Sequence, residues 1–124
     1  MFEAQLLIAK SGSDVLIYSG WSSRQGDYMR ATVEVVGISS ANCTLQTTLY
    51  SKDSEETTDG AVVDAAVVIT QTATGRSTEE WGPSTGTGLN ELVRYRFKVT
   101  QSGGALEWVL FRVLPPVWFD AVKA

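Results

Sequence analysis

The segment from Leu92 to Phe119 constrains the fold more than any other part of the sequence. Its first arm alternates apolar residues with basic ones, the apolar set being Val93, Tyr95, Phe97 and Val99 and the basic set Arg94, Arg96 and Lys98. A period of two is typical of a strand with one buried and one solvated face, and a helix would not keep the two sets apart. We therefore predict a strand over this arm.

The second arm of this segment, Ala105 to Leu114, is apolar on both faces and ends at two consecutive prolines. Such a strand is covered on both sides, or it lies at a contact between subunits. The short loop between the arms contains two glycines, so we predict that the arms pair as a hairpin at the centre of a sheet.

Runs of strand character follow one another along the rest of the chain. They cover Phe2–Ala9, Asp14–Ser19, Tyr28–Ile38, Cys43–Tyr50, Ala61–Gln71 and a short final strand within Val117–Ala124. We expect the first two to be joined by a hairpin turn at Lys10–Ser13 and the next two to pair, with a bulge or bend at Gly37. The long polar region Thr72–Asn90 includes a short strand or helical turn at Thr78–Trp81.

These runs predict about eight strands with no amphipathic helix between them. Consecutive antiparallel strands in two packed sheets are the natural arrangement, so we predict one all-β sandwich domain over residues 1–124. Its topology is a jelly roll or an immunoglobulin-like fold, and the pattern does not choose between them.

The composition removes many kinds of chemistry. Histidine is absent, which excludes Ser-His-Asp and Cys-His nucleophile systems and zinc sites that need histidine. The one cysteine, Cys43, lies in an apolar run and is expected to be a small buried residue. The acidic pairs Glu55–Glu56 and Glu79–Glu80 lie in polar loops, where they would not supply the desolvated general acid of a glycosidase. We predict no enzymatic activity and no cofactor.

Two loops resemble ligand motifs without matching them. Ser51–Gly60, SKDSEETTDG, lacks the ordered acidic series of a calcium loop and is expected to be a solvated turn. Gly82–Gly88, GPSTGTG, lacks the lysine and the following helix of a phosphate-binding loop. We therefore expect neither a metal site nor a small-molecule ligand.

The charge and hydropathy of the chain bear on its partners and its location. The net charge of −4 argues against a general nucleic-acid surface. The N-terminus lacks the basic start of a signal peptide, and no run is long and apolar enough to cross a bilayer as a helix. We expect no membrane contact and a location in the cytoplasm or in a virion.

Two features suggest binding surfaces. The basic row Arg94, Arg96 and Lys98 fits an anionic partner, or it pairs across strands with acids such as Glu34 and Glu107. Trp21 and Trp81 are predicted to lie in loops. If they are exposed there, they would suit a carbohydrate-binding module, which is the alternative function. For Trp21, however, the preferred interpretation is a ring that folds back over an open end of the core.

The third feature is the surplus of apolar residues on the second arm, which favours an assembly module. Its predicted interface consists of Trp108, Leu110, Phe111, Arg112 and Trp118. In addition, Thr32–Tyr50 followed by SKDSEETTDG, and later LNELVRYRFKVT, resembles the small β-sandwich accessory proteins of phage and phage-like particles. The resemblance implies a structural subunit of a virion or similar particle that forms homo-oligomers or joins other structural subunits. No site residue follows from it.

Overall fold

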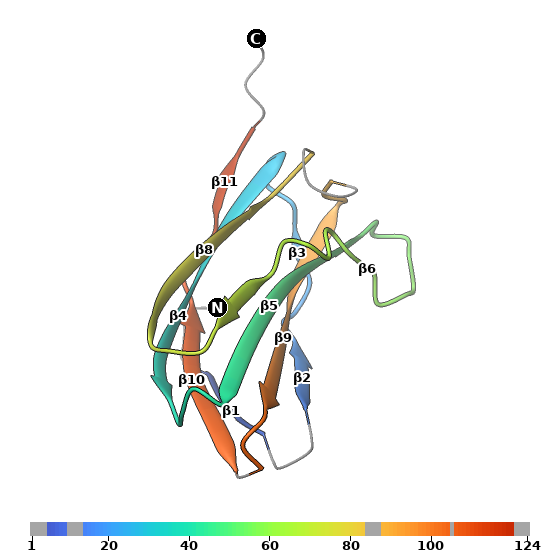
Figure 1. Cartoon of the computed structure of the whole chain (residues 1–124). Helices are drawn as coiled ribbons and strands as arrows, with labels where there is room; N and C mark the ends of the chain where they lie inside the picture. Colours follow the sequence, from blue (N-terminus) through green and yellow to red (C-terminus); the bar gives the residue numbers. More distant parts are fainter. Residues whose placement is uncertain (1–4, 10–13, 84–87, 105, 121–124) are drawn as a thin grey trace.

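The structure, a computed structural model, describes residues 5–9, 14–83, 88–104 and 106–120. It is an all-β sandwich of two antiparallel sheets (Figure 1). Sheet A contains β1 (Gln5–Ala9), β4 (Tyr28–Ile38), β8 (Gly75–Trp81), β10 (Glu107–Val113) and β11 (Val117–Phe119). Sheet B contains β2 (Val15–Tyr18), β3 (Ser22–Ser23), β5 (Cys43–Lys52), β6 (Ala61–Val62), β7 (Ile69–Gln71) and β9 (Leu92–Gln101).

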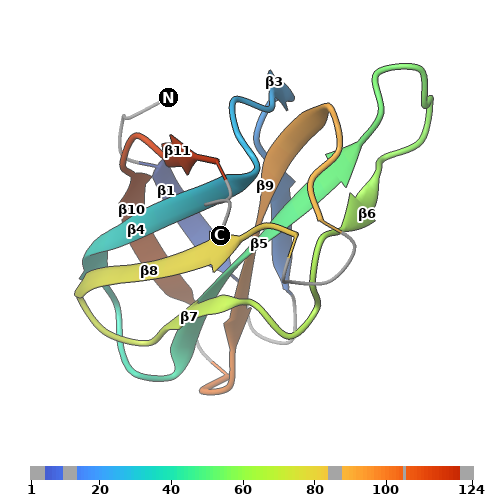
Figure 2. The same ribbon diagram turned by 90° about the horizontal axis from the view of Figure 1, so that it is seen from above.

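The strand order is that of a jelly roll. Sheet A runs β1-β10-β4-β8 and sheet B runs β2-β9-β5-β7, with β11 beside β4, β3 beside β9 and β6 beside β5. The pairs β1–β10, β2–β9, β4–β8 and β5–β7 are nested in the sequence, and each is antiparallel. The two sheets are seen from above in Figure 2. In the immunoglobulin fold the consecutive strands A and B share a sheet, so that alternative is excluded.

The three hairpins predicted from neighbouring strands are all wrong. β1 and β2, β4 and β5, and β9 and β10 each lie in different sheets. For β4 and β5, and for β9 and β10, the apolar faces of the two strands therefore oppose each other across the core instead of lying side by side. Phe97 of β9 and Phe111 of β10 show the result, since their ring centroids are 4.8 Å apart across the core.

The inward faces of the central strands form one apolar core. The alternation predicted for β9 is confirmed, because Val93, Phe97 and Val99 are buried and the basic residues between them face outward. β4 contributes Met29, Ala31, Val33 and Val35, and β5 contributes Cys43, Leu45 and Leu49. Burial raises the pKa of the Cys43 thiol, which is a small core residue as predicted.

Two segments between the central strands differ from the sequence expectation. Ala61–Gln71 is not one strand, because Asp64 accepts a hydrogen bond from the Ala66 amide at 2.9 Å and starts a turn between β6 and β7. Conversely, the predicted short strand at Thr78–Trp81 is part of a longer edge strand, β8, which pairs with β4 along seven positions.

Several predicted features lie outside the described residues. These are the first residues of the Phe2–Ala9 run, the turn at Lys10–Ser13, most of the Gly82–Gly88 loop and the end of the Val117–Ala124 run. Within the described part of the chain, no helix is long and apolar enough to span a membrane.

Candidate functional site

The five residues of the predicted interface do not share one face. Trp108, Leu110 and Arg112 point outward from sheet A, and the indole of Trp108 is 39% exposed. Phe111, by contrast, is fully buried, so its prediction as an interface residue is wrong. Because the side chains of a strand alternate between its two faces, the neighbours Leu110 and Arg112 point outward while Phe111 points into the core. Trp118 of β11 is partly buried against the core.

A compact apolar patch surrounds Trp108, and we call Val36, Gly37, Trp108 and Leu110 the Trp108 patch. Between Leu110 and Phe111 the register with β4 shifts, which confirms the bulge predicted at Gly37. The shift leaves Val36 without a partner in the register and 49% exposed. Gly37 lies under the indole, since a Cβ added to it would be 3.2 Å from Cζ3 of Trp108.

The charged residues on the outer face of sheet A have partners on the same sheet. Glu34 binds Arg112 at 2.8 Å and also Arg76 on β8. Arg30 binds Glu80 at 3.0 Å. The hydrogen bond from Arg76, together with the hydrogen bond from Arg112 and the charges of both arginines, holds the pKa of Glu34 below its ordinary value, against the opposing effect of burial. The outer face of sheet A therefore combines exposed apolar groups with ion pairs formed within the chain.

The lowered pKa of Glu34 predicts how its contribution to stability depends on pH. A carboxylate with a depressed folded-state pKa stabilises the protein above its unfolded-state pKa, and this stabilisation is lost as the pH falls through the folded value. We expect Glu34→Gln to be less stable than wild type at pH 7, with the difference disappearing in acid. Urea unfolding at pH 7 and pH 3 measures this. An equal difference at both values would contradict it, and the exposed Glu55→Gln is the control.

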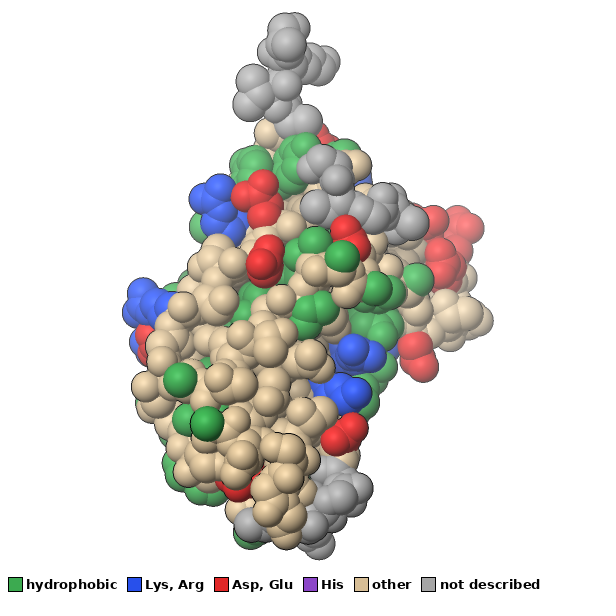
Figure 3. All heavy atoms as spheres, viewed as in Figure 1, with side chains coloured by type: hydrophobic (Ala, Val, Ile, Leu, Met, Phe, Trp, Pro, Cys, Tyr) green, Lys and Arg blue, Asp and Glu red, His purple; other side chains and the backbone are tan. Residues whose placement is uncertain are grey.

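The basic row lies on the outer face of sheet B, as its alternation predicted, but not with the predicted partners. Arg94 lies 3.6 Å from Asp59, and Lys98 lies 3.7 Å from Asp14. Arg96 donates a hydrogen bond to the hydroxyl of Tyr50 at 3.0 Å. Both acids come from loops, since Asp59 lies between β5 and β6 and Asp14 directly precedes β2. The acidic side chains of the β5–β6 loop stand out at the right of Figure 3.

Neither acid that was predicted to pair with this row does so. Glu34 is in sheet A, where it binds arginines of that sheet. Glu107 is buried and accepts hydrogen bonds from the hydroxyls of Ser39 and Ser40. The alternation along a single strand indicates which side chains face outward, but not which strand or loop lies next to them.

The two tryptophans of the carbohydrate alternative occupy different environments. Trp81 is the last residue of β8 and is fully buried, so its prediction as a loop residue is wrong, and it offers no face to a sugar ring. Trp21 is half-buried on the outer side of sheet B. The guanidinium of Arg94 lies 4.4 Å from its ring centroid and the ammonium of Lys52 4.7 Å. Its ring therefore packs against Arg94, one residue of the basic row, and against Lys52, and these contacts do not support the predicted plug over the core.

The acidic pairs form no catalytic arrangement. Glu55 and Glu56 are exposed in the loop after β5, where the backbone carbonyl of Glu56 accepts a hydrogen bond from Lys52. Glu79 and Glu80 point to opposite faces of β8, and Glu80 is held by Arg30. Retaining and inverting glycosidases need two carboxyl groups facing one substrate bond, and neither pair has that geometry.

No protein-family model, curated protein or solved structure matches the chain.

The sequence did not identify every residue of the Trp108 patch. Val36 follows the same alternation as the outward residues Arg30 and Glu34, and this is the signal in the sequence that indicates an outward side chain. The bulge at Gly37 adds that Val36 has no partner in the register.

Proposed function

We propose that this protein is a non-enzymatic structural subunit that associates with further copies of itself through the Trp108 patch. Jelly rolls occur in capsid, lectin and cupin domains alike, so topology does not select a function. The observation that carries the proposal is the half-exposed indole of Trp108, seated over Gly37 and beside the exposed Val36. The phage-like particle implied by the resemblance is the kind of assembly that such a subunit would build.

The charges around the patch favour a second copy as its occupant. Arg76 and Arg112 share Glu34 as their partner, and Arg30, farther along β4, pairs with Glu80, so another molecule need not supply a strong opposing charge. It must supply an apolar surface without unpaired charges at its centre, because burying an unpaired charge is costly. The same face of another copy has these properties, and a two-fold contact would bring the two indoles together.

The experiment is analytical ultracentrifugation of the wild type and of Trp108→Asp over a concentration series. We expect the wild type to self-associate and the variant to associate at least about tenfold more weakly, because a charge would be buried at the centre of the contact. Circular dichroism would show that the variant is folded, as expected for a side chain that is 39% exposed.

A matched control is Leu16→Asp. Leu16 is 45% exposed and apolar like Trp108, but it lies on β2 in sheet B. The proposal predicts that this variant associates as the wild type does. A wild type that stays monomeric at the highest concentration, or equal weakening by both substitutions, would overturn it.

A further inference from the structure

Two adjoining cavities lie on one side of the sandwich, between the β2–β3 segment of sheet B and the β10–β11 segment of sheet A. Their volumes are about 440 Å³ and about 130 Å³, and both are lined by Ser22, Tyr95 and Val113. Pockets that hold small molecules typically measure about 300–1,000 Å³, so the larger cavity is of sufficient size.

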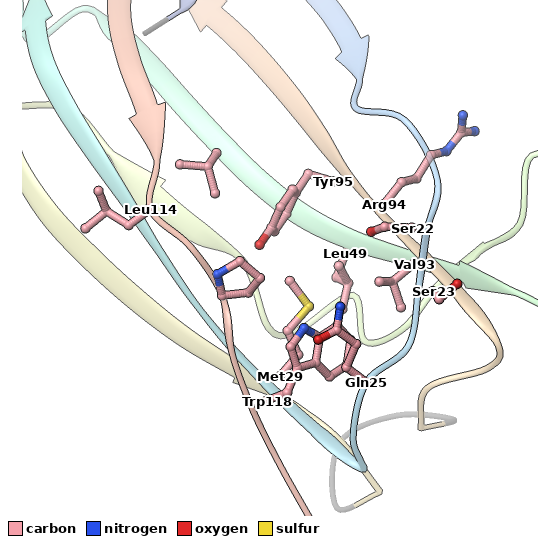
Figure 4. A pocket seen from close by; sticks show the side chains of 12 residues that line it. Ser22, Ser23, Gln25, Met29, Leu49, Val93, Arg94, Tyr95, Leu114 and Trp118 are labelled. Atoms are coloured by element: carbon pink, nitrogen blue, oxygen red, sulfur yellow. The ribbon is translucent and has the colours of Figure 1, made fainter. Parts of the chain in front are cut away.

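Tyr95 lines both cavities, and its hydroxyl is a buried polar group of this lining. Figure 4 shows the ring reaching from β9 into the smaller cavity with its oxygen at the inner end. This oxygen is buried and has no hydrogen-bond partner among the described residues. Buried hydroxyls are nearly always paired, because an unsatisfied one costs free energy. Burial also raises the pKa of Tyr95, so the phenol stays neutral and can donate.

The other lining residues are mainly apolar and carry no charge into the cavities. The larger cavity is bounded by Ile17, Trp21 and Phe97, and the smaller by Met29, Leu49 and Trp118. Arg94 contributes to the lining of the smaller one, but its guanidinium points away from it (Figure 4) and binds Asp59. A charged ligand would therefore be desolvated without an opposing charge.

We propose that this side of the sandwich binds a small, uncharged and largely apolar molecule through one hydrogen-bond acceptor, such as a carbonyl oxygen, placed on the hydroxyl of Tyr95. We expected no small-molecule ligand from the sequence. The lining of this site comes from separate segments between residues 17 and 118, so no contiguous motif in the sequence indicates it. The inference is independent of self-association, since Trp108 and Val36 do not line either cavity.

The test uses two probes of similar size and shape, acetophenone, which has a carbonyl oxygen, and ethylbenzene, which does not. Binding is followed by chemical-shift titration of wild type and of Tyr95→Phe. We expect the substitution to weaken the binding of acetophenone about fivefold, which corresponds to the loss of one neutral hydrogen bond, and to leave the affinity for ethylbenzene unchanged. Tyr95→Phe should unfold at the same temperature as the wild type or higher, because an unpaired buried hydroxyl is removed.

A second variant tests the location. Ser22 is an exposed residue that lines both cavities. Ser22→Trp should therefore obstruct the cavities and weaken the binding of both probes, while the protein remains folded. Three results would overturn the proposal: no binding of either probe up to its solubility limit, equal effects of Tyr95→Phe on the two probes, or unchanged binding in Ser22→Trp. None of them bears on association through the Trp108 patch.

Discussion

Replacing Phe111 by alanine is expected to lower the free energy of unfolding by about 3–5 kcal/mol. Phe111 is fully buried, and its ring lies 4.8 Å from that of Phe97 on the opposite sheet. The substitution removes the transfer free energy of a large apolar side chain and leaves a cavity between two sheets that cannot fully collapse around it. Urea denaturation followed by circular dichroism measures the change.

The control for Phe111→Ala is Trp108→Ala on the same strand. Trp108 is larger but 39% exposed on the outer face, so its removal should cost less, about 1 kcal/mol in the monomer. The comparison is made at protein concentrations below self-association, because association would add to the apparent stability of the wild type. If the two variants lost equal stability, the assignment of inner and outer faces on β10 would be wrong.

Trp81→Ala should have an effect of similar size, about 3–5 kcal/mol. Trp81 is fully buried in the core, and Met29 of β4 is its register partner. It is among the largest fully buried side chains of the described residues, so its loss would open the end of the sandwich where β8 stops. Denaturant unfolding of the variant measures this loss.

Two further substitutions make the Trp81 result specific. Trp81→Phe should recover much of the stability, because the indole Nε1 has no hydrogen-bond partner among the described residues and mainly the apolar volume matters. Trp21→Ala should cost clearly less than Trp81→Ala, since Trp21 is only half-buried and contacts basic side chains on the surface. If Trp81→Ala were as mild as an exposed substitution, Trp81 would not be a core residue.

The sequence by itself determined the inner and outer faces of those strands in which apolar and polar residues alternate. The alternation of Val93, Phe97 and Val99 with the basic row needs only the period of a strand, and it is confirmed. The bulge at Gly37 and the burial of Cys43 were predicted for the same local reason. The absence of histidine likewise excluded whole classes of chemistry before any fold was known.

Only the tertiary structure decided which strands are neighbours. The apolar faces of two strands are buried both when the strands are neighbours in one sheet that packs on another layer and when they face each other across a core. The local pattern is the same in both cases. The jelly roll takes the second arrangement for β9 and β10, so Phe111 faces Phe97 and Trp108 is left outside. It also brings Tyr95 and Val113 together beside Ser22. Both proposed sites thus depend on contacts between strands that are distant in the sequence.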